Sequence, residues 1–448
     1  MTGTETTTLN KTEQGYFERE LRLISEVTPM QLCGRVVKVI GLVIECEGLS
    51  VPVGSLCVVA PSFASRPVEA VVVGFREDHA LLMPLGEMEG IKRFDQVRHL
   101  PGSQLVPVGW ELIGRVVDAR GRPIDDGPPL LTTTMNPLYA RPPQSLTRPR
   151  INQSISTGIR AVDALATCGR GQRLGLFSGS GVGKSLLMGM VAKFTSAQVC
   201  VIALVGERGR EVRDFIERDL GPEGLRKSVV VVATSDEPPL MRVRAPFTAS
   251  AIAEFFRDQG ADVMLMMDSI TRAANAQREI GLSAGEPPTT KGYPPSVFAM
   301  MPRLLERAGR DVRGSITGIY TVLVEADDIN EPIADTARSI LDGHVWLSRD
   351  LANRGHYPAI DPLTSISRLM IDVVSKEHVQ AATRMRSILA TYRSAEDLIN
   401  IGAYAKGGNP EIDRAIGMID RINEFLKQRF DEVCPFGDTV ARLIELMK

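Results

Sequence analysis

A glycine-rich loop between a strand and a helix is the strongest chemical signal in the sequence. The apolar run 174–177 leads into SGSGVGKS, residues 178–185, and the helical stretch LLMGMVAKF follows. Glycines let successive N–H groups point at phosphate oxygens, while the helix N-terminus adds its dipole. In such loops the lysine, here Lys184, bridges the β- and γ-phosphates, and the hydroxyl, here Ser185, binds Mg²⁺. The spacing predicts a nucleoside triphosphate site.

The loop departs from the consensus G-x-x-x-x-G-K-[ST] at its first position, which is Ser178. The alternative is a glycine-rich turn that precedes a lysine by chance, and the flanking strand and helix argue against it. We expect the whole loop to bind nucleotide: Ser178, Gly179, Ser180, Gly181, Val182, Gly183, Lys184 and Ser185.

Two carboxylates follow other apolar strands. The apolar residues 263–267 are followed by Asp268, which can hold Mg²⁺ directly or through water. The alternative is that Asp268 caps the helix that follows. Residues 201–205 lead to Glu207, where parallel sheets place their ligands. Glu207 is our candidate to orient and polarise an attacking water, and the alternative is a surface charge.

The elements around these residues predict an α/β fold with two flanking domains. We expect residues 1–30 to be a flexible N-terminus with a short helix, and residues 31–100, rich in short β runs, to form a β-barrel. Strands and helices then alternate over 101–370, as in a parallel sheet covered on both faces, and 371–448 forms a helical domain. The predicted strands of the sheet are 173–177, 199–205, 228–233, 263–267 and 319–324.

Composition narrows the class of protein. The 448 residues carry a net charge of −2, so no overall field recruits nucleic acid or anionic lipid. The six cysteines are far apart, which argues against a zinc site or a disulfide scaffold and favours reduced core thiols. With no signal peptide and no run near ~18 apolar residues, we expect a cytoplasmic protein.

Taken together, these motifs resemble the RecA-like catalytic subunits of the rotary ATPases. GRVVDARGRPID (114–125), the phosphate loop, GERGREV (206–212), MDSITR (267–272) and HYPAIDPLTSISR (356–368) occur in the same order. Within that class the sequence is most similar to the flagellar protein export ATPases and their virulence type III secretion relatives, notably at GYPPSVFAMMPRLLERAG (292–309) and IGAYAKGGNPEIDRAI (401–416). The resemblance implies a RecA-like P-loop NTPase core with an N-terminal β-barrel and a C-terminal α-helical domain.

The resemblance also implies roles for single residues. Glu207 would be the catalytic carboxylate, with Arg208 as a neighbouring charge that faces phosphate and Arg272 as a neighbour of Asp268. Arg368 would be an arginine finger that enters the next subunit's site. Stacking on adenine would fall to Tyr357, with Phe430 and Phe436 completing the pocket; core packing is the alternative for these two phenylalanines.

As a whole, the resemblance implies an ATPase that uses ATP and Mg²⁺ and couples hydrolysis to unfolding and delivery of export substrates. It implies a homohexamer that is peripheral to the inner membrane. Its implied partners are a regulator, stalk proteins, the export gate and chaperone–substrate complexes, with no nucleic acid.

Other functions stay open at this point. A Rho-like RNA translocase also joins a β-barrel to a RecA-like core, but single-strand binders need stacking aromatics in a basic groove. Residues 31–100 hold only Phe63, Phe75 and Phe94 as aromatics. A non-catalytic nucleotide-binding subunit usually lacks the carboxylate found here at Glu207. The ATP synthase catalytic subunit has an acidic DELSEED stretch that this sequence lacks.

The N-terminal segment carries an apolar stripe at helical spacing, formed by Phe17, Leu21 and Ile24. A helix of this length is marginal in water, so we expect the stripe to lie on a surface. That surface is either the chain's own barrel or the regulator implied by the resemblance.

Overall fold

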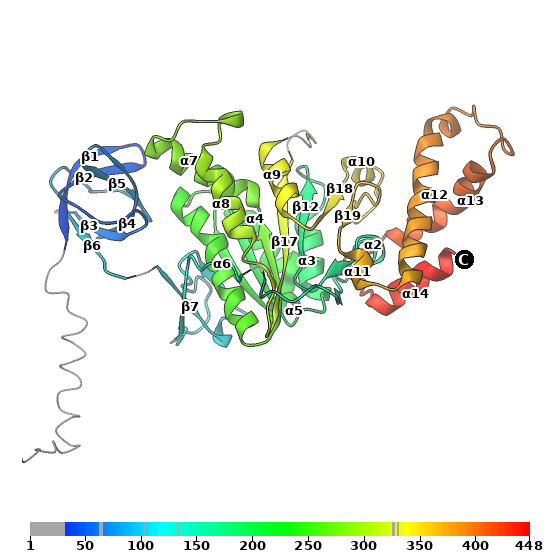
Figure 1. Ribbon diagram of the computed structural model, residues 1–448, viewed down its shortest axis with the longest axis horizontal. Coiled ribbons are helices and arrows are strands. Elements are labelled where there is room, and N and C mark those ends of the chain that lie inside the picture. Colours follow the sequence, from blue (N-terminus) through cyan, green and yellow to red (C-terminus); the bar gives the residue numbers. More distant parts are fainter. Residues whose placement is uncertain are drawn as a thin grey trace, which may run out of the picture. The chain divides into compact units, whose positions relative to one another are not determined.

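The computed structural model describes residues 32–61, 66–102, 104–132, 134–144, 146–324, 328 and 331–448. The predicted N-terminal helix with Phe17, Leu21 and Ile24 lies outside these residues. By its contacts the chain divides into two compact units, Met1–Gly102 and Ser103–Lys448 (Figure 1). In the described part of the chain, no helix is both long and apolar enough to cross a membrane.

The first unit holds a closed six-stranded β-barrel, as predicted. Its strands are β1 (Cys33–Ile40), β2 (Val43–Glu47), β3 (Leu56–Ala60), β4 (Val68–Arg76), β5 (His79–Pro84) and β6 (Gln96–His99). They pair antiparallel in the order β1-β2-β5-β4-β3-β6, and β6 closes onto β1. Inward side chains such as Val36, Ile44 and Leu82 are fully buried, because a barrel this small is filled by its own side chains.

The second unit is built on a sheet of nine strands. They are β8 (Val116–Asp118), β12 (Arg173–Ser178), β13 (Val199–Val205), β14 (Ser228–Ala233), β15 (Asp262–Asp268), β16 (Gly309–Arg310), β17 (Ser315–Leu323), β18 (Gly343–Leu347) and β19 (Ile366–Ser367). The order is β19-β18-β12-β17-β15-β13-β14-β8, with β16 beside β17. All pairs are parallel except those of β16 and β19. The predicted parallel sheet is confirmed, and β8, β16, β18 and β19 are strands that the prediction missed.

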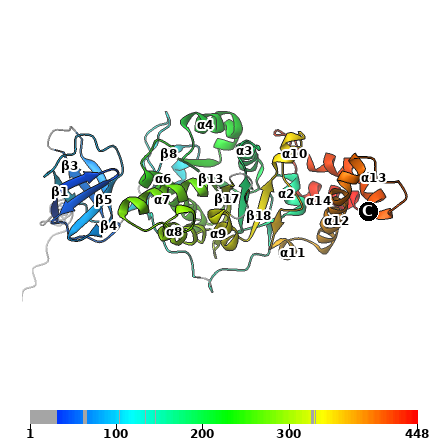
Figure 2. The same cartoon turned by 90° about the horizontal axis from the view of Figure 1, so that it is seen from above.

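Helices cover both faces of this sheet. Figure 2 shows α7, α8 and α9 on one face and α3 and α4 on the other. The bounds of this group are α3 (Lys184–Phe194), α4 (Gly209–Asp214), η2 (Phe215–Leu220), α5 (Gly221–Leu225), α6 (Pro239–Asp258), α7 (Ile270–Ala284), α8 (Pro295–Leu305) and α9 (Pro332–Ile340). Strands buried on both faces need apolar side chains throughout, and β13 reads VCVIALV with every residue buried.

The C-terminal part is helical, as predicted. It comprises α11 (Met370–Val373), α12 (Lys376–Asn400), α13 (Pro410–Leu426) and α14 (Phe436–Leu446); the short helix α10 (Arg349–Asn353) precedes it, within the span predicted for the core. Side-chain caps begin the two longest helices of this C-terminal part, α12 and α13. Ser375 accepts a hydrogen bond from the His378 N–H, and Asn409 accepts one from the Glu411 N–H. Helices α12, α13 and α14 pack against α2 (Arg160–Leu165) and share one hydrophobic core with the sheet.

The remaining short elements connect these parts. They are β7 (Leu105–Val108), η1 (Trp110–Leu112), β9 (Thr134–Pro137), β10 (Ser154–Ile155), β11 (Cys168–Gly169) and η3 (Thr290–Gly292). Strand β7 pairs with β9, and β10 pairs with β11.

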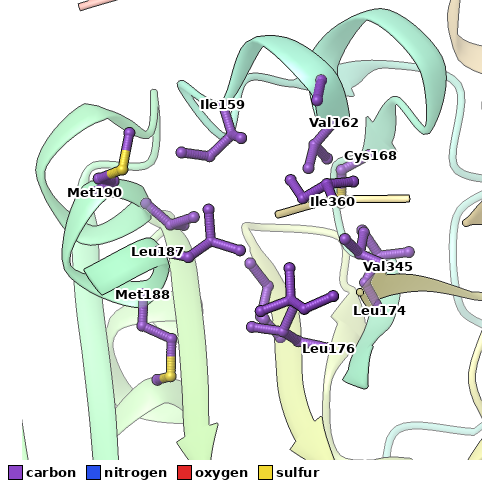
Figure 3. Close-up of a cluster of buried hydrophobic side chains, with 14 of the residues drawn as sticks. Ile159, Val162, Cys168, Leu174, Leu176, Leu187, Met188, Met190, Val345 and Ile360 are labelled. Carbon is purple, nitrogen blue, oxygen red and sulfur yellow. The ribbon is translucent and has the colours of Figure 1, made fainter. Parts of the chain in front are cut away.

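A buried apolar cluster joins α2 and α3 to the sheet. Figure 3 shows Ile159 before α2, Leu187 of α3, and Leu174 and Leu176 of β12 gathered in this cluster. All four side chains are at most 4% exposed. Because protein interiors are close-packed, this contact fixes α2 and the first turns of α3 relative to β12.

Candidate active site

The phosphate loop lies where strand β12 ends, with β17 and β18 on either side of the strand. Helix α3 begins at Lys184, so the last two residues of the loop, Lys184 and Ser185, form its first turn. Gly181 and Gly183 have φ values of 79° and 92°, a region that side-chain-bearing residues rarely adopt. These two positions therefore need glycine. The loop has the backbone form and the helix N-terminus that bind phosphate.

Ser178, the residue that departs from the consensus, is fully buried at the end of β12. Its backbone oxygen accepts a hydrogen bond from the Val324 N–H at 3.0 Å. Its hydroxyl has no hydrogen-bond partner among the described residues. Ser178 therefore belongs to the end of the strand, and the glycines of the loop follow it.

Lys184 contacts two carboxylates from other strands. Its Nζ donates to Asp268 Oδ1 and lies 3.6 Å from Glu207 Oε1. Asp268, the last residue of β15, also accepts a hydrogen bond of 2.8 Å from the Thr321 hydroxyl on β17. Three residues that the sequence places after or beside separate strands thus meet at one edge of the sheet, as parallel strand ends predict.

Glu207 follows the end of β13 and is 8% exposed. Its Oε2 lies 3.0 Å from a guanidinium nitrogen of Arg272, which is on α7 and also donates to the Gly206 carbonyl. The resemblance implies that Arg272 is a neighbour of Asp268; in the structure its guanidinium contacts Glu207. The carboxylate therefore lies between two cations, Arg272 and Lys184.

Burial raises the pKa of Glu207 to about 7. A hydrogen bond with Glu211 and the charge of Asp268 also raise this pKa. The nearby cations Lys184 and Arg272 lower it, and burial outweighs them. A carboxyl group that titrates near neutral pH can accept a proton from water, as a general base does.

A cavity of about 550 Å³ opens beside the phosphate loop. Val182 and Gly183 form one side of it, and the segment between α13 and α14 forms another. Tyr357 and Phe430 also line it, and their side chains are 45% and 56% exposed. A nucleobase can stack between or upon such aromatic faces.

Three predicted site residues lie away from this centre. Arg208 is 80% exposed, with its guanidinium 3.8 Å from Glu211. Arg368 is exposed after β19, and its guanidinium lies 3.4 Å from the Arg338 carbonyl. Phe436 begins α14 and does not line the cavity; its ring centroid is 6.1 Å from that of His378. This position favours the packing alternative for Phe436 over a place in the base pocket.

Thr321, Arg160 and Gln428 hold site residues or cavity walls in place, and none of the three is predicted from the sequence. Thr321 is a hydroxyl within an apolar strand, and that is the only signal it offers. Arg160 and Gln428 are 268 positions apart in the chain, and no local pattern connects them.

The fold and this geometry define a class before any relative is considered: the second unit is a RecA-like P-loop nucleotide hydrolase core. Residues 158–367 match the nucleotide-binding domain model of the ATP synthase alpha/beta family, and residues 36–100 match that family's beta-barrel domain. Residues 374–445 match the T3SS EscN ATPase C-terminal domain.

Known proteins resemble the chain over most of its length. It is 54% identical to the flagellum-specific ATP synthase of Bacillus subtilis, over 92% of this chain and 94% of that one. It is 49% identical to a type 3 secretion system ATPase of Xanthomonas euvesicatoria, over 92% and 93% of the two chains. The assembled ATPase EscN of enteropathogenic E. coli superposes with a TM-score of 0.87 at 43% identity, over 93% of this chain and all of that one. The chain therefore belongs to the ATP synthase alpha/beta family and is an ATPase of its flagellar and type III secretion export branch.

Proposed function

We propose that this ATPase powers the flagellar export apparatus, coupling ATP hydrolysis to unfolding and delivery of export substrates. The observation that carries the proposal is the meeting of Lys184, Glu207 and Asp268 at one sheet edge beside an aromatic-lined cavity. The flagellum-specific relatives support the flagellar assignment over its alternative, a virulence secretion ATPase.

In the proposed reaction, the phosphate loop and Lys184 bind the phosphates of ATP, and Glu207 takes a proton from the attacking water. The adenine stacks on Tyr357 and Phe430. The exposed side chain of Arg208, at the start of α4, would contact the phosphates from solvent. Water attacks the γ-phosphorus and the bond to the β-phosphate oxygen breaks, so that ADP and phosphate leave without a covalent intermediate.

The oxygen donors present fit Mg²⁺. The Ser185 hydroxyl and the Asp268 carboxylate would hold it, since this ion is bound by one or two carboxylates together with substrate phosphates. The nucleotide phosphates would supply further ligands. Bound Mg²⁺ would neutralise charge on the phosphate oxygens.

We further propose that the chain acts as a homohexamer in which Arg368 enters the next subunit's site. The exposed position of Arg368 after β19 supports this. Solved structures describe EscN as assembled and in complex with its central stalk EscO, which supports an assembly with a stalk partner here too. A regulator, the export gate and chaperone–substrate complexes at the inner membrane complete the proposed set of partners.

The proposed ATP hydrolysis is tested with the variants Lys184→Ala and Glu207→Gln. The first should weaken binding of a fluorescent ATP analogue and abolish turnover. The second should keep binding and lose hydrolysis, because only activation of water is removed. Glu223→Gln, an exposed carboxylate on α5, is the matched control and should behave as wild type. Turnover at the wild-type rate in Glu207→Gln would remove Glu207 from the role of base.

The proposed role in flagellar export is tested by complementation in a strain that lacks its own flagellar export ATPase. The wild-type chain should restore secretion of flagellar proteins into the medium, and Glu207→Gln should not. Restoration of virulence secretion but not of flagellar secretion would favour the alternative. Stimulation of ATPase activity by homopolymeric RNA would instead favour the alternative function, a Rho-like RNA translocase.

A further inference from the structure

The wall of the nucleotide cavity opposite the phosphate loop is an irregular segment. It runs from the end of α13 at Leu426 to the start of α14 at Phe436, and it carries Lys427, Gln428 and Phe430 to the cavity. Lacking a helix or strand ladder, it must be held by other contacts. We call residues 427–434 the base-side segment.

Arg160, the first residue of α2, binds this segment at both ends. The residue is 3% exposed. Its Nη1 donates to the carbonyls of Phe425 and Lys427, at 3.0 Å and 2.8 Å. Its Nη2 forms an ion pair with Glu432 and donates to the Cys434 sulfur at 3.0 Å. One guanidinium thus satisfies carbonyls left unpaired at the C-terminus of α13 and holds the far end of the segment.

Gln428, which is 5% exposed, completes the attachment from the side of the segment. Its Oε1 accepts the Arg160 backbone N–H at 2.8 Å. Its Nε2 donates to the carbonyls of Gly158 and Glu432, both at 2.9 Å. Its own N–H donates to the Tyr357 carbonyl at 3.0 Å, which ties the segment to the other aromatic residue of the cavity.

The residues that Arg160 and Gln428 hold on to are themselves fixed. Asp163 on α2 is fully buried and accepts hydrogen bonds from the Thr157 N–H at 2.9 Å and the Ser156 hydroxyl at 2.6 Å, which locks the turn that leads into the helix. Ile159 and Val162 lie in the buried cluster that also contains Leu187 of the phosphate-loop helix (Figure 3). The core that positions the phosphate loop therefore also positions Arg160.

We propose that Arg160 and Gln428 are positioning residues for nucleotide binding: they set the distance between the phosphate loop and the stacking ring of Phe430 without touching the nucleotide. This inference rests on the proposed function in taking the cavity as the adenine site. The side chains of both residues are used by protein contacts, so their effect reaches the nucleotide through Phe430 and Tyr357. Their loss should weaken recognition of the base and spare recognition of the phosphates.

The experiment compares two probes in the full chain: ATP, and inorganic tripolyphosphate, which has phosphates but no base. In Arg160→Lys and Gln428→Ala we expect the KM for ATP to rise by about tenfold or more, with kcat changed by no more than about twofold. The inhibition constant of tripolyphosphate should stay at its wild-type value. A role confined to stability would lower the melting temperature and leave this difference between the probes absent.

Controls separate the inference from the function on which it rests. Arg442→Lys is the matched control. The guanidinium carbons of Arg160 and Arg442 lie 5.9 Å and 5.8 Å from the Phe425 ring centroid, but Arg442 is an exposed residue of α14, so its variant should leave the results with both probes unchanged. Phe430→Ala should mimic the Arg160 variant. If Phe430→Ala leaves the KM for ATP unchanged, the adenine site itself is misplaced.

If Phe430→Ala weakens ATP while Arg160→Lys and Gln428→Ala do not, the positioning role alone is overturned. Equal loss of ATP and tripolyphosphate in the Arg160 and Gln428 variants would also overturn it. Should Arg160→Lys fail to fold, Gln428→Ala decides the outcome, since it removes a neutral side chain and leaves the buried guanidinium paired.

Discussion

The Glu207 carboxylate lies 3.0 Å from the Arg272 guanidinium through its Oε2, and its Oε1 lies 3.6 Å from Lys184 Nζ. Arg272 comes four residues after Asp268 in the chain, so the end of β15 and the first turn of α7 supply both the carboxylate proposed to hold Mg²⁺ and a cation beside the proposed base. The protonation of Glu207 is thus set by a balance of burial against two positive charges.

This balance predicts a pH dependence for the wild-type enzyme. Because the pKa of Glu207 is raised to about 7 and the base must be deprotonated, kcat/KM for ATP should rise about tenfold per pH unit below this value and level off above it. Steady-state rates from about pH 6 to about pH 8 in buffers of constant ionic strength would measure the profile. A flat profile would contradict a base with this pKa.

Substitution of Arg272 should shift that profile. Arg272 lowers the pKa of Glu207, so Arg272→Gln should move the midpoint of kcat/KM to higher pH. Arg272→Lys keeps the charge and should move the midpoint less, which separates charge from the geometry of the guanidinium. A midpoint at lower pH in Arg272→Gln would show that another group controls the profile.

Thr321 supports the other carboxylate. Its hydroxyl donates 2.8 Å to Asp268 Oδ1, and both residues are buried. Thr321→Val keeps the volume and removes the donor to a charged acceptor, so the free energy of unfolding should fall by about 1.5–3 kcal/mol. Urea unfolding of the chain would measure this loss. Thr321→Ser retains the hydroxyl and removes only a methyl group, so it should lose less. If Thr321→Val is as stable as the wild type, the hydrogen bond to Asp268 contributes nothing to stability.

The strands that could be predicted from the sequence are those with a clear local pattern of apolar residues. Strands β13 and β14 have the predicted bounds because unbroken apolar runs between helices can only be buried strands. Strands β8 and β18 were missed: β8 has three residues, and β18 alternates buried and half-buried positions. Neither pattern resembles the continuous apolar run used to find the sheet.

The same distinction applies to the site. Glu207 and Asp268 were found because a carboxylate just after an apolar strand is visible in the sequence, and the catalytic roles given to them stay predictions. The contact of Thr321 with Asp268 spans 53 positions, and that of Arg160 with Gln428 spans 268. Such pairs exist only once the sheet order and helix packing are known. Residues that support the site therefore came from the structure alone.

Gly189 marks a close contact between the phosphate-loop helix and its neighbour. A Cβ added there would lie 2.5 Å from the backbone oxygen of Asp219, in the π-helical turn η2. Gly189→Ala should force α3 and η2 apart and reduce the free energy of unfolding by about 1–3 kcal/mol. Because α3 carries Lys184, the KM for ATP should rise as well.

The matched control for Gly189 is Gly417, a helical glycine on α13 with nothing within 4 Å of an added Cβ. Gly417→Ala should be neutral or slightly stabilising, since alanine favours a helix over glycine by about 1 kcal/mol. Chemical unfolding of both variants gives the comparison. If Gly189→Ala were as stable as Gly417→Ala, helix α3 would not be held against η2 as closely as this contact requires.

The proposed finger, Arg368, gives the sharpest test of a ring. An arginine that acts on the next subunit's phosphates is worth about 10³–10⁵ in rate, so Arg368→Ala should be nearly inactive and still bind ATP. In rings that mix wild-type and Arg368→Ala subunits, each variant subunit would inactivate the neighbouring subunit's site. The rate of ATP hydrolysis should therefore fall faster than the fraction of wild-type subunits. Turnover per wild-type subunit should rise with protein concentration as rings form. Strict proportionality to the wild-type fraction at every concentration would mean that each chain completes its own site and that Arg368 acts within it or not at all.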